Sequence, residues 1–280
     1  MLKKLLFLSL CLCLCSNSIA QVNFSKDDTE SRKNITASGF IDYPPFGSVL
    51  TTRDSMNYKN IFSEMLEDYA KDYYFNVSYR YRDKYRKILQ SLRAGDIDIM
   101  LGVYSGTDDY RGLELIYPAI ISNPIVIVTL PKNSAKIKNI DDLGNLKGAI
   151  GSFEYLSDFV KSEVKKRNVL FVETPFDLYK KLYTGDVDYI LASAYNARIV
   201  IAKLGLTGKF SISQNAVWDI PIFLGISKFS PYRDQLRRGL TKISENPDSK
   251  VALENLIKKE ISQNESLYSG VVAPDFFEKQ

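Results

Sequence analysis

The chain has 280 residues, 45% of them apolar and 25% charged, so it can bury a substantial core as one large domain or as two lobes. It contains no histidine, which excludes Ser-His-Asp and Cys-His catalysis and any metal or haem site with imidazole ligands. Its formal net charge of +4 is too small to indicate binding to nucleic acid.

The first twenty residues have the pattern of a secretory signal. A basic start precedes an apolar run over residues 5–15, and two small residues, Ser18 and Ala20, stand at the −3 and −1 positions of a cleavage site. The run is too short for the roughly 20 residues of a spanning helix, so we prefer a cleaved signal, residues 1–20, to a membrane anchor. Lipid attachment at Cys15 is a weaker alternative. All three cysteines lie in this segment, so we expect a secreted chain without a disulfide or a thiolate metal site.

The mature chain is expected to begin with a flexible, polar lead-in over residues 21–33. A strand over residues 34–40 follows and ends at a Tyr-Pro-Pro-Phe sequence. Two adjacent prolines favour an extended loop, which would present Tyr43 and Phe46 at the end of the strand.

Hydrophobic periodicity predicts the elements that follow. Apolar residues at spacings of three and four indicate amphipathic helices, and alternating or continuous apolar runs indicate strands. The predicted helices cover residues 58–73, 232–244 and 249–261, and the predicted strands cover residues 75–79, 124–130 and 220–226.

One sequence pattern occurs twice, ninety residues apart. Leu-Arg-Ala-Gly-Asp-Ile-Asp-Ile-Met-Leu at residues 92–101 returns as Leu-Tyr-Thr-Gly-Asp-Val-Asp-Tyr-Ile-Leu at residues 182–191. Each copy is expected to end a helix at its glycine, Gly95 or Gly185, and to turn through acidic residues into a buried strand. The repeat predicts an α/β protein with two similarly built lobes, whose strands are mainly parallel.

Two strands would connect these lobes. The chain leaves the first lobe after the strand at 124–130 and returns through the strand at 220–226. We therefore predict that the first lobe contains residues 34–130 and 225–280, and the second lobe residues 131–224.

Several short motifs, in this order, resemble the family-3 extracellular solute-binding proteins, the periplasmic receptors of polar amino-acid ABC transporters. The motifs are Gly39-x-x-x-Tyr-Pro-Pro-Phe46, Leu92-x-x-Gly-Asp-x-Asp98, Ser105-x-Thr-x-x-x-Arg111, Ile116-Tyr-Pro-Ala-Ile120, Leu146-Lys-Gly148 with Ile150-Gly-Ser152, Gly185-x-x-Asp188 and Leu224-Gly-Ile-Ser-Lys228. The resemblance implies a two-lobe type II periplasmic-binding-protein fold, each lobe a mainly parallel sheet flanked by helices, joined by a two-strand hinge and closing on its ligand.

The same resemblance implies a function. The protein would be a periplasmic monomer that captures a small carboxylate-bearing solute, an amino acid or a related compound, and delivers it to an inner-membrane ABC permease. No catalysis, cofactor, metal or nucleic acid is expected. Two alternatives remain open. The chain is either an enzyme similar to the cyclohexadienyl dehydratases, with an acid or base such as Glu154 or Asp219, or a ligand sensor without a role in transport.

The resemblance assigns the ligand's carboxylate to Arg111, whose guanidinium offers parallel donors and stays charged when desolvated. Ser105 and Thr107 would complete this anion site with their hydroxyls, and Tyr43 would stack on the ligand. The alternatives are a surface arginine at Arg111 and ordinary turn or N-cap residues at positions 105 and 107.

Four other residues are candidates for the walls and the second lobe of the site. Ser152 would bind an anion at the N-terminus of a helix expected to begin near Glu154, or would only cap that helix. Phe46, Tyr104 and Trp218 are candidate pocket walls, with core packing as the alternative for each.

The chain departs from the family pattern at Ser193. Relatives usually carry an aspartate eight residues after the second glycine, which pairs with the ligand's ammonium, and that position counted from Gly185 is a serine here. A desolvated ammonium without a carboxylate partner is costly. We therefore expect either that another acid, Asp42 or Asp219, takes this role or that the ligand is not a standard α-amino acid.

Overall fold

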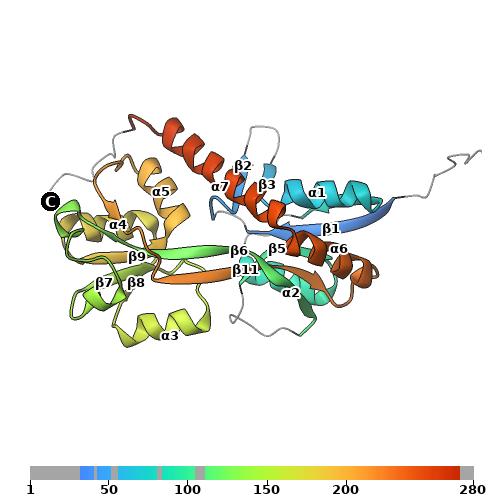
Figure 1. Ribbon diagram of the computed structural model, residues 1–280, viewed down its shortest axis with the longest axis horizontal. Coiled ribbons are helices and arrows are strands. Elements are labelled where there is room, and N and C mark those ends of the chain that lie inside the picture. The colour runs from blue at the N-terminus through green and yellow to red at the C-terminus, as the bar shows by residue number, and fades with distance from the viewer. Residues whose placement is uncertain (1–31, 41–42, 52–55, 81–83, 105–110, 272–280) are drawn as a thin grey trace, which may run out of the picture. The chain divides into compact units, whose positions relative to one another are not determined.

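The computed structural model describes residues 32–40, 43–51, 56–80, 84–104 and 111–271 (Figure 1). The predicted signal peptide lies outside these residues, as do Asp42, Ser105 and Thr107. None of the described helices combines the length and the hydrophobicity of a membrane span.

A nine-stranded mixed sheet runs through the described chain in the order β4-β1-β5-β11-β6-β9-β7-β8, and β10 pairs with β6. Its strands are β1 (Lys33–Gly39), β4 (Phe75–Tyr79), β5 (Ile99–Tyr104), β6 (Leu113–Thr129), β7 (Gly148–Gly151), β8 (Leu170–Val172), β9 (Tyr189–Ser193), β10 (Ser211–Ile212) and β11 (Trp218–Ser227). Two parallel groups, β4-β1-β5 and β9-β7-β8, flank the antiparallel pair β6 and β11. Two further strands, β2 (Gly47–Thr51) and β3 (Met56–Asn60), form a separate hairpin.

Helices cover both sides of each parallel group (Figure 1). In the first group α1 and α2 lie on opposite sides, and in the second group α3 lies opposite α4 and α5. The helices are α1 (Ser63–Asp72), α2 (Tyr85–Ala94), α3 (Asp158–Lys166), α4 (Pro175–Thr184), α5 (Ala194–Lys203), α6 (Arg233–Glu245) and α7 (Pro247–Leu267), with short 3₁₀ turns η1 (Pro131–Asn133) and η2 (Ile140–Leu143). This arrangement confirms the α/β architecture that the repeat predicted.

The long strands β6 and β11 connect the two parallel groups, side by side in Figure 1. Residues 113–116 of β6 pair with residues 224–227 of β11, and after a shift in register residues 121–125 pair with residues 218–222. Residues 222–226 of β11 also pair with β5 of the first parallel group, and residues 125–129 of β6 pair with β9 of the second. A two-strand connection is therefore present, whereas the lobe boundaries at residues 130 and 225 stay a prediction.

Both copies of the repeat have the same local structure. Helix α2 ends at Gly95 and α4 ends at Gly185, with φ of +82° and +83°, a left-handed conformation that a residue without Cβ adopts at little cost. Each second aspartate then binds the backbone of a neighbouring segment: Asp98 accepts from the Thr36 N–H at 2.8 Å, and Asp188 accepts from the Lys147 N–H at 2.9 Å. These paired turns fix the start of β5 and of β9 in the same way.

Two sequence predictions in the first half were wrong in their boundaries. The helix expected over residues 58–73 begins only at Ser63, because residues 56–60 pair with β2 as a strand. Asn60 separates the two elements, since its side chain accepts from the Phe62 N–H at 2.9 Å. The strand expected over residues 124–130 is the second half of the 17-residue β6. The two C-terminal helices are confirmed as α6 and α7.

Gly47 closes the Tyr-Pro-Pro-Phe loop by exchanging backbone hydrogen bonds with Tyr43 at 2.9 and 3.2 Å. A Cβ atom at this glycine would lie 1.8 Å from the Phe40 carbonyl oxygen, a backbone atom that cannot turn aside. We therefore expect Gly47→Ala to lower the free energy of unfolding by at least ~2 kcal/mol, as measured by urea denaturation. Gly208→Ala, at a turn where a Cβ meets no atom within 4 Å, is the control and carries only backbone strain, about 1 kcal/mol. Equal losses in the two variants would contradict the clash at Gly47.

Candidate functional site

Side chains from both parallel groups meet at the carboxyl ends of their strands, where ligand sites of α/β proteins lie. Five of them form a connected polar cluster, which consists of Tyr43 after β1, Tyr104 at the end of β5, Asn123 in β6, Glu154 after β7 and Ser193 at the end of β9. All five are buried.

Hydrogen bonds join every member of the polar cluster. Tyr43 Oη donates to Glu154 Oε2 at 2.5 Å, and the Ser193 N–H donates to Glu154 Oε1 at 3.4 Å. Asn123 Nδ2 donates to the hydroxyls of Tyr43 at 3.2 Å and Tyr104 at 3.3 Å, while Asn123 Oδ1 accepts from Ser193 Oγ at 2.6 Å. Because each buried polar group has a partner, the cluster satisfies the requirement for burial of polar groups and holds its members in fixed positions.

Among the described residues, Glu154 is the one charged residue that is buried, with 7% of its surface exposed. Burial raises the pKa of Glu154 from 4.5 to about 7, because water no longer stabilises the carboxylate, and the hydrogen bonds from Tyr43 and Ser193 partly oppose this rise. Burial also raises the pKa of Tyr43 well above its usual value, with the neighbouring Glu154 carboxylate as a further cause. Glu154 is therefore poised to exchange a proton or to pair with a cation near neutral pH.

An aromatic cage adjoins the polar cluster. It consists of Phe40, Tyr43 and Tyr104, from the first parallel group and its loops, and Tyr85, from helix α2. These rings surround the ring of Tyr155. Tyr155 comes from the other group, on the segment between β7 and α3. Contacts across the two groups also include Asn196 Nδ2, which donates to the Pro44 carbonyl at 2.9 Å.

Of the residues proposed from the sequence, the structure brings Tyr43, Tyr104 and Ser193 together in the polar cluster. Phe46 is fully buried and stacks on the ring of Tyr43 at 6.0 Å, which is the packing alternative. Trp218 is half-buried where β11 begins, against the edge of the main core. Their predicted contacts with a ligand stay predictions.

The remaining candidates lie at the surface of the described chain. Arg111 is exposed, two residues before β6 begins. Ser105 and Thr107, the two residues proposed to act with it, lie outside the described residues. Ser152 is exposed, and its hydroxyl donates to Glu173 at 2.9 Å. The helix expected near Glu154 begins only at Asp158, capped by Ser157, so the prediction that Ser152 lies at a helix N-terminus was wrong.

The sequence did not identify Glu154 as the acid beside Ser193. Asp219, one of the two acids considered there, is exposed in β11. Glu154 lies three residues after Gly151, between Phe153 and Tyr155, and no local pattern distinguishes it from a surface glutamate. Only the pairing of β7 with β9 brings Glu154 next to Ser193.

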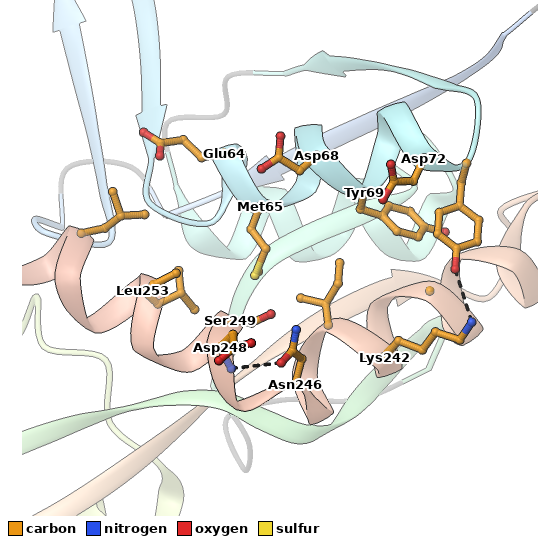
Figure 2. Close-up of a pocket in the computed structure, with 15 residues that line it drawn as sticks. Glu64, Met65, Asp68, Tyr69, Asp72, Lys242, Asn246, Asp248, Ser249 and Leu253 are labelled. Carbon is orange, nitrogen blue, oxygen red and sulfur yellow. Dashed lines mark hydrogen bonds between the residues drawn. The ribbon is translucent and has the colours of Figure 1, made fainter.

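A hollow of about 480 Å³ lies away from the polar cluster, between α1, α6 and α7 (Figure 2). Acidic side chains follow one another along α1 at its rim, Glu64, Asp68 and Asp72, and apolar side chains such as Met65 and Leu253 line its floor. None of the residues proposed from the sequence lines this groove.

No family model and no curated protein matches the sequence. Solved structures resemble it at low identity. The amino acid ABC transporter substrate-binding protein AbpA of Streptococcus pneumoniae, bound to L-arginine, is 14% identical with a TM-score of 0.60, over 82% of this chain and 95% of that one. A histidine kinase sensor domain is 16% identical with a TM-score of 0.58, over 87% and 99%. The GluR0 ligand-binding core of Nostoc punctiforme, with L-glutamate, is 17% identical with a TM-score of 0.55, over 81% and 98%. At these identities the likeness concerns the fold.

Proposed function

Because the chain has the two-lobe type II periplasmic-binding fold, we propose that it is a solute-binding protein that captures an amino acid or a related small solute between its lobes. One observation carries the proposal: a buried carboxylate, Glu154, lies where the strand ends of both lobes meet. The structural neighbours that bind L-arginine and L-glutamate support it. Periplasmic location, a monomeric state and delivery of the solute to an ABC permease belong to the same proposal.

In this proposal Glu154 replaces the aspartate that the family carries at the position of Ser193. An ammonium group of the solute would pair with the Glu154 carboxylate, and Tyr43 and the Ser193 N–H would hold that carboxylate in place. The solute's cation would replace the lost hydration of the buried carboxylate, which favours its charged form. Arg111, with Ser105 and Thr107, would bind the solute's carboxylate.

Glu154→Gln tests the ammonium site. The amide keeps the shape of the side chain and removes its charge, so we expect binding of an amine-bearing solute to weaken by at least ~30-fold, the loss typical of a broken buried charge pair. Isothermal titration calorimetry with a panel of amino acids measures the change. Glu163→Gln on α3, whose carboxylate pairs with Lys166 at the surface, is the matched control and should bind like the wild type. Unchanged affinity in Glu154→Gln would refute this role.

Arg111→Ala tests the carboxylate site. We expect it to abolish binding of carboxylate-bearing solutes and to leave the melting temperature nearly unchanged, because Arg111 is exposed. The exposed Arg86 on α2 offers the matched Arg86→Ala control. A variant of Arg111 that still binds the solute with wild-type affinity would remove this residue from the site.

A second function, dehydration of a cyclohexadienyl acid, is favoured by the state of Glu154. Loss of a hydroxyl group requires a proton donor, and a carboxyl group with a pKa of about 7 is about half protonated at neutral pH, so it can supply that proton. Incubation of the pure protein with prephenate or arogenate, followed by absorbance of the aromatic product, tests this function. Product that forms with the wild type and not with Glu154→Gln would establish it; no product would leave binding as the function.

A further inference from the structure

Tyr155 inserts its ring into the aromatic cage from the opposite lobe. Its ring centroid lies 5.1 Å from Phe40, 4.9 Å from Tyr43, 5.0 Å from Tyr85 and 5.5 Å from Tyr104. The ring is parallel to Tyr104, with an interplanar angle of 11°, and perpendicular to Tyr43, at 88°. Stacked and edge-to-face contacts are the arrangements that aromatic rings prefer, so the cage accommodates a flat ring specifically.

The cage does not depend on Tyr155 for its shape. Asn123 donates to the hydroxyls of both Tyr43 and Tyr104, and the Tyr104 N–H donates to the hydroxyl of Tyr85 at 3.1 Å. Phe40 packs so closely on Gly102 that a Cβ there would lie 2.1 Å from its ring. Four rings held by their own partners would keep their positions if Tyr155 left the cage.

Tyr155 lies on a segment without regular secondary structure. Residues 152–157 form neither helix nor strand between β7 and α3, and the ring is only half-buried. Its neighbour Glu154 belongs to the polar cluster, so the cage and the buried carboxylate are adjacent parts of one site.

We propose that the aromatic cage is the part of the solute site that takes the solute's side chain, that this side chain is a flat aromatic group, and that Tyr155 occupies its place until a solute displaces it. The inference rests on the proposed function. With Glu154 as the partner of an ammonium group, the solute class is an aromatic amino acid or an aromatic amine. A resident ring lowers the apparent affinity, because the fraction of molecules with an open cage limits binding.

The experiment compares the wild type with Tyr155→Ala, Tyr155→Phe and Tyr183→Ala in calorimetric titrations with L-phenylalanine, tyramine and L-leucine. Tyr183, in the second lobe, packs against Phe210 in a separate core cluster and is the matched control. We expect Tyr155→Ala to bind L-phenylalanine and tyramine about tenfold more tightly than the wild type. Binding of L-leucine should change less than twofold, and the Tyr183 variant should match the wild type. Tyr155→Phe, which keeps a ring in the cage, should not show the tenfold gain.

A gain for L-leucine equal to that for L-phenylalanine would overturn the inference, since the cage would then be an apolar space without preference for a ring. Weaker or unchanged binding of the aromatic ligands to Tyr155→Ala would also overturn it. If Tyr155→Ala does not fold, Tyr155→Leu, which keeps an apolar side chain, undergoes the same comparison. The proposed function has a separate test. If no amino acid of a wider panel binds to the wild type or to any variant, the proposed function is refuted, and the inference is refuted with it.

Discussion

Raising the pH from 5 to 8 is expected to lower the free energy of unfolding by about 2.5 kcal/mol through Glu154 alone. Burial raises the pKa of Glu154 from 4.5 to about 7, so between these values the folded chain holds a proton that the unfolded chain releases. This contribution is fully present below pH ~4.5 and is lost as the pH rises through ~7. Urea denaturation at a series of pH values measures it.

Glu154→Gln isolates the effect, because the amide does not titrate. The difference in the free energy of unfolding between the wild type and the variant should change by about 2.5 kcal/mol between pH 5 and pH 8. The absence of histidine helps, since no imidazole titrates between pH 5 and 8 to obscure the slope. Parallel pH profiles for the two proteins would contradict the burial of Glu154.

Asn123→Ala is expected to cost about 3 kcal/mol in the free energy of unfolding. The side chain is fully buried and makes three hydrogen bonds, to Ser193 and to the hydroxyls of Tyr43 and Tyr104. Its removal would take one hydrogen-bond partner from each of three buried hydroxyls, and a buried hydrogen bond left unmade costs about 1–3 kcal/mol where water cannot enter. Chemical denaturation of the variant measures the loss.

An exposed asparagine provides the comparison. Asn76 on β4 is exposed, and its side chain donates to that of Asn34 at 3.2 Å, so Asn76→Ala should change stability by less than about 0.5 kcal/mol. The large loss should also be accompanied by weaker solute binding, because Asn123 holds two rings of the aromatic cage. A loss at Asn123 no greater than that at Asn76 would show that water fills the gap in the polar cluster.

Local signals in the sequence predicted much of the fold. The repeated Gly-Asp-x-Asp turns have the same helix capping in both halves, because glycine geometry acts within a few residues. The matching hydrogen bonds of Asp98 and Asp188 reach backbone segments far away along the chain. Helix boundaries were less reliable. The helix expected from Tyr58 begins at Ser63, since residues 56–60 pair with the preceding strand β2 in a hairpin.

The sequence predicted only some of the residues of the candidate site. Tyr43 and Ser193 were identified through their motifs, and both belong to the polar cluster. Glu154 and Tyr155 stand in no pattern that marks them. Their contacts lie more than 35 residues away along the chain, at Tyr43, Ser193 and the aromatic cage.

The sequence by itself determined the α/β class, the two-fold repeat and the catalytic chemistries that a chain without histidine cannot use, because composition and periodicity act locally. Only the tertiary structure decided which acid is buried beside Ser193 and which ring fills the cage. Burial and the pKa of a carboxyl group depend on groups that strand pairing brings together from both halves of the chain, and no local spacing encodes that meeting.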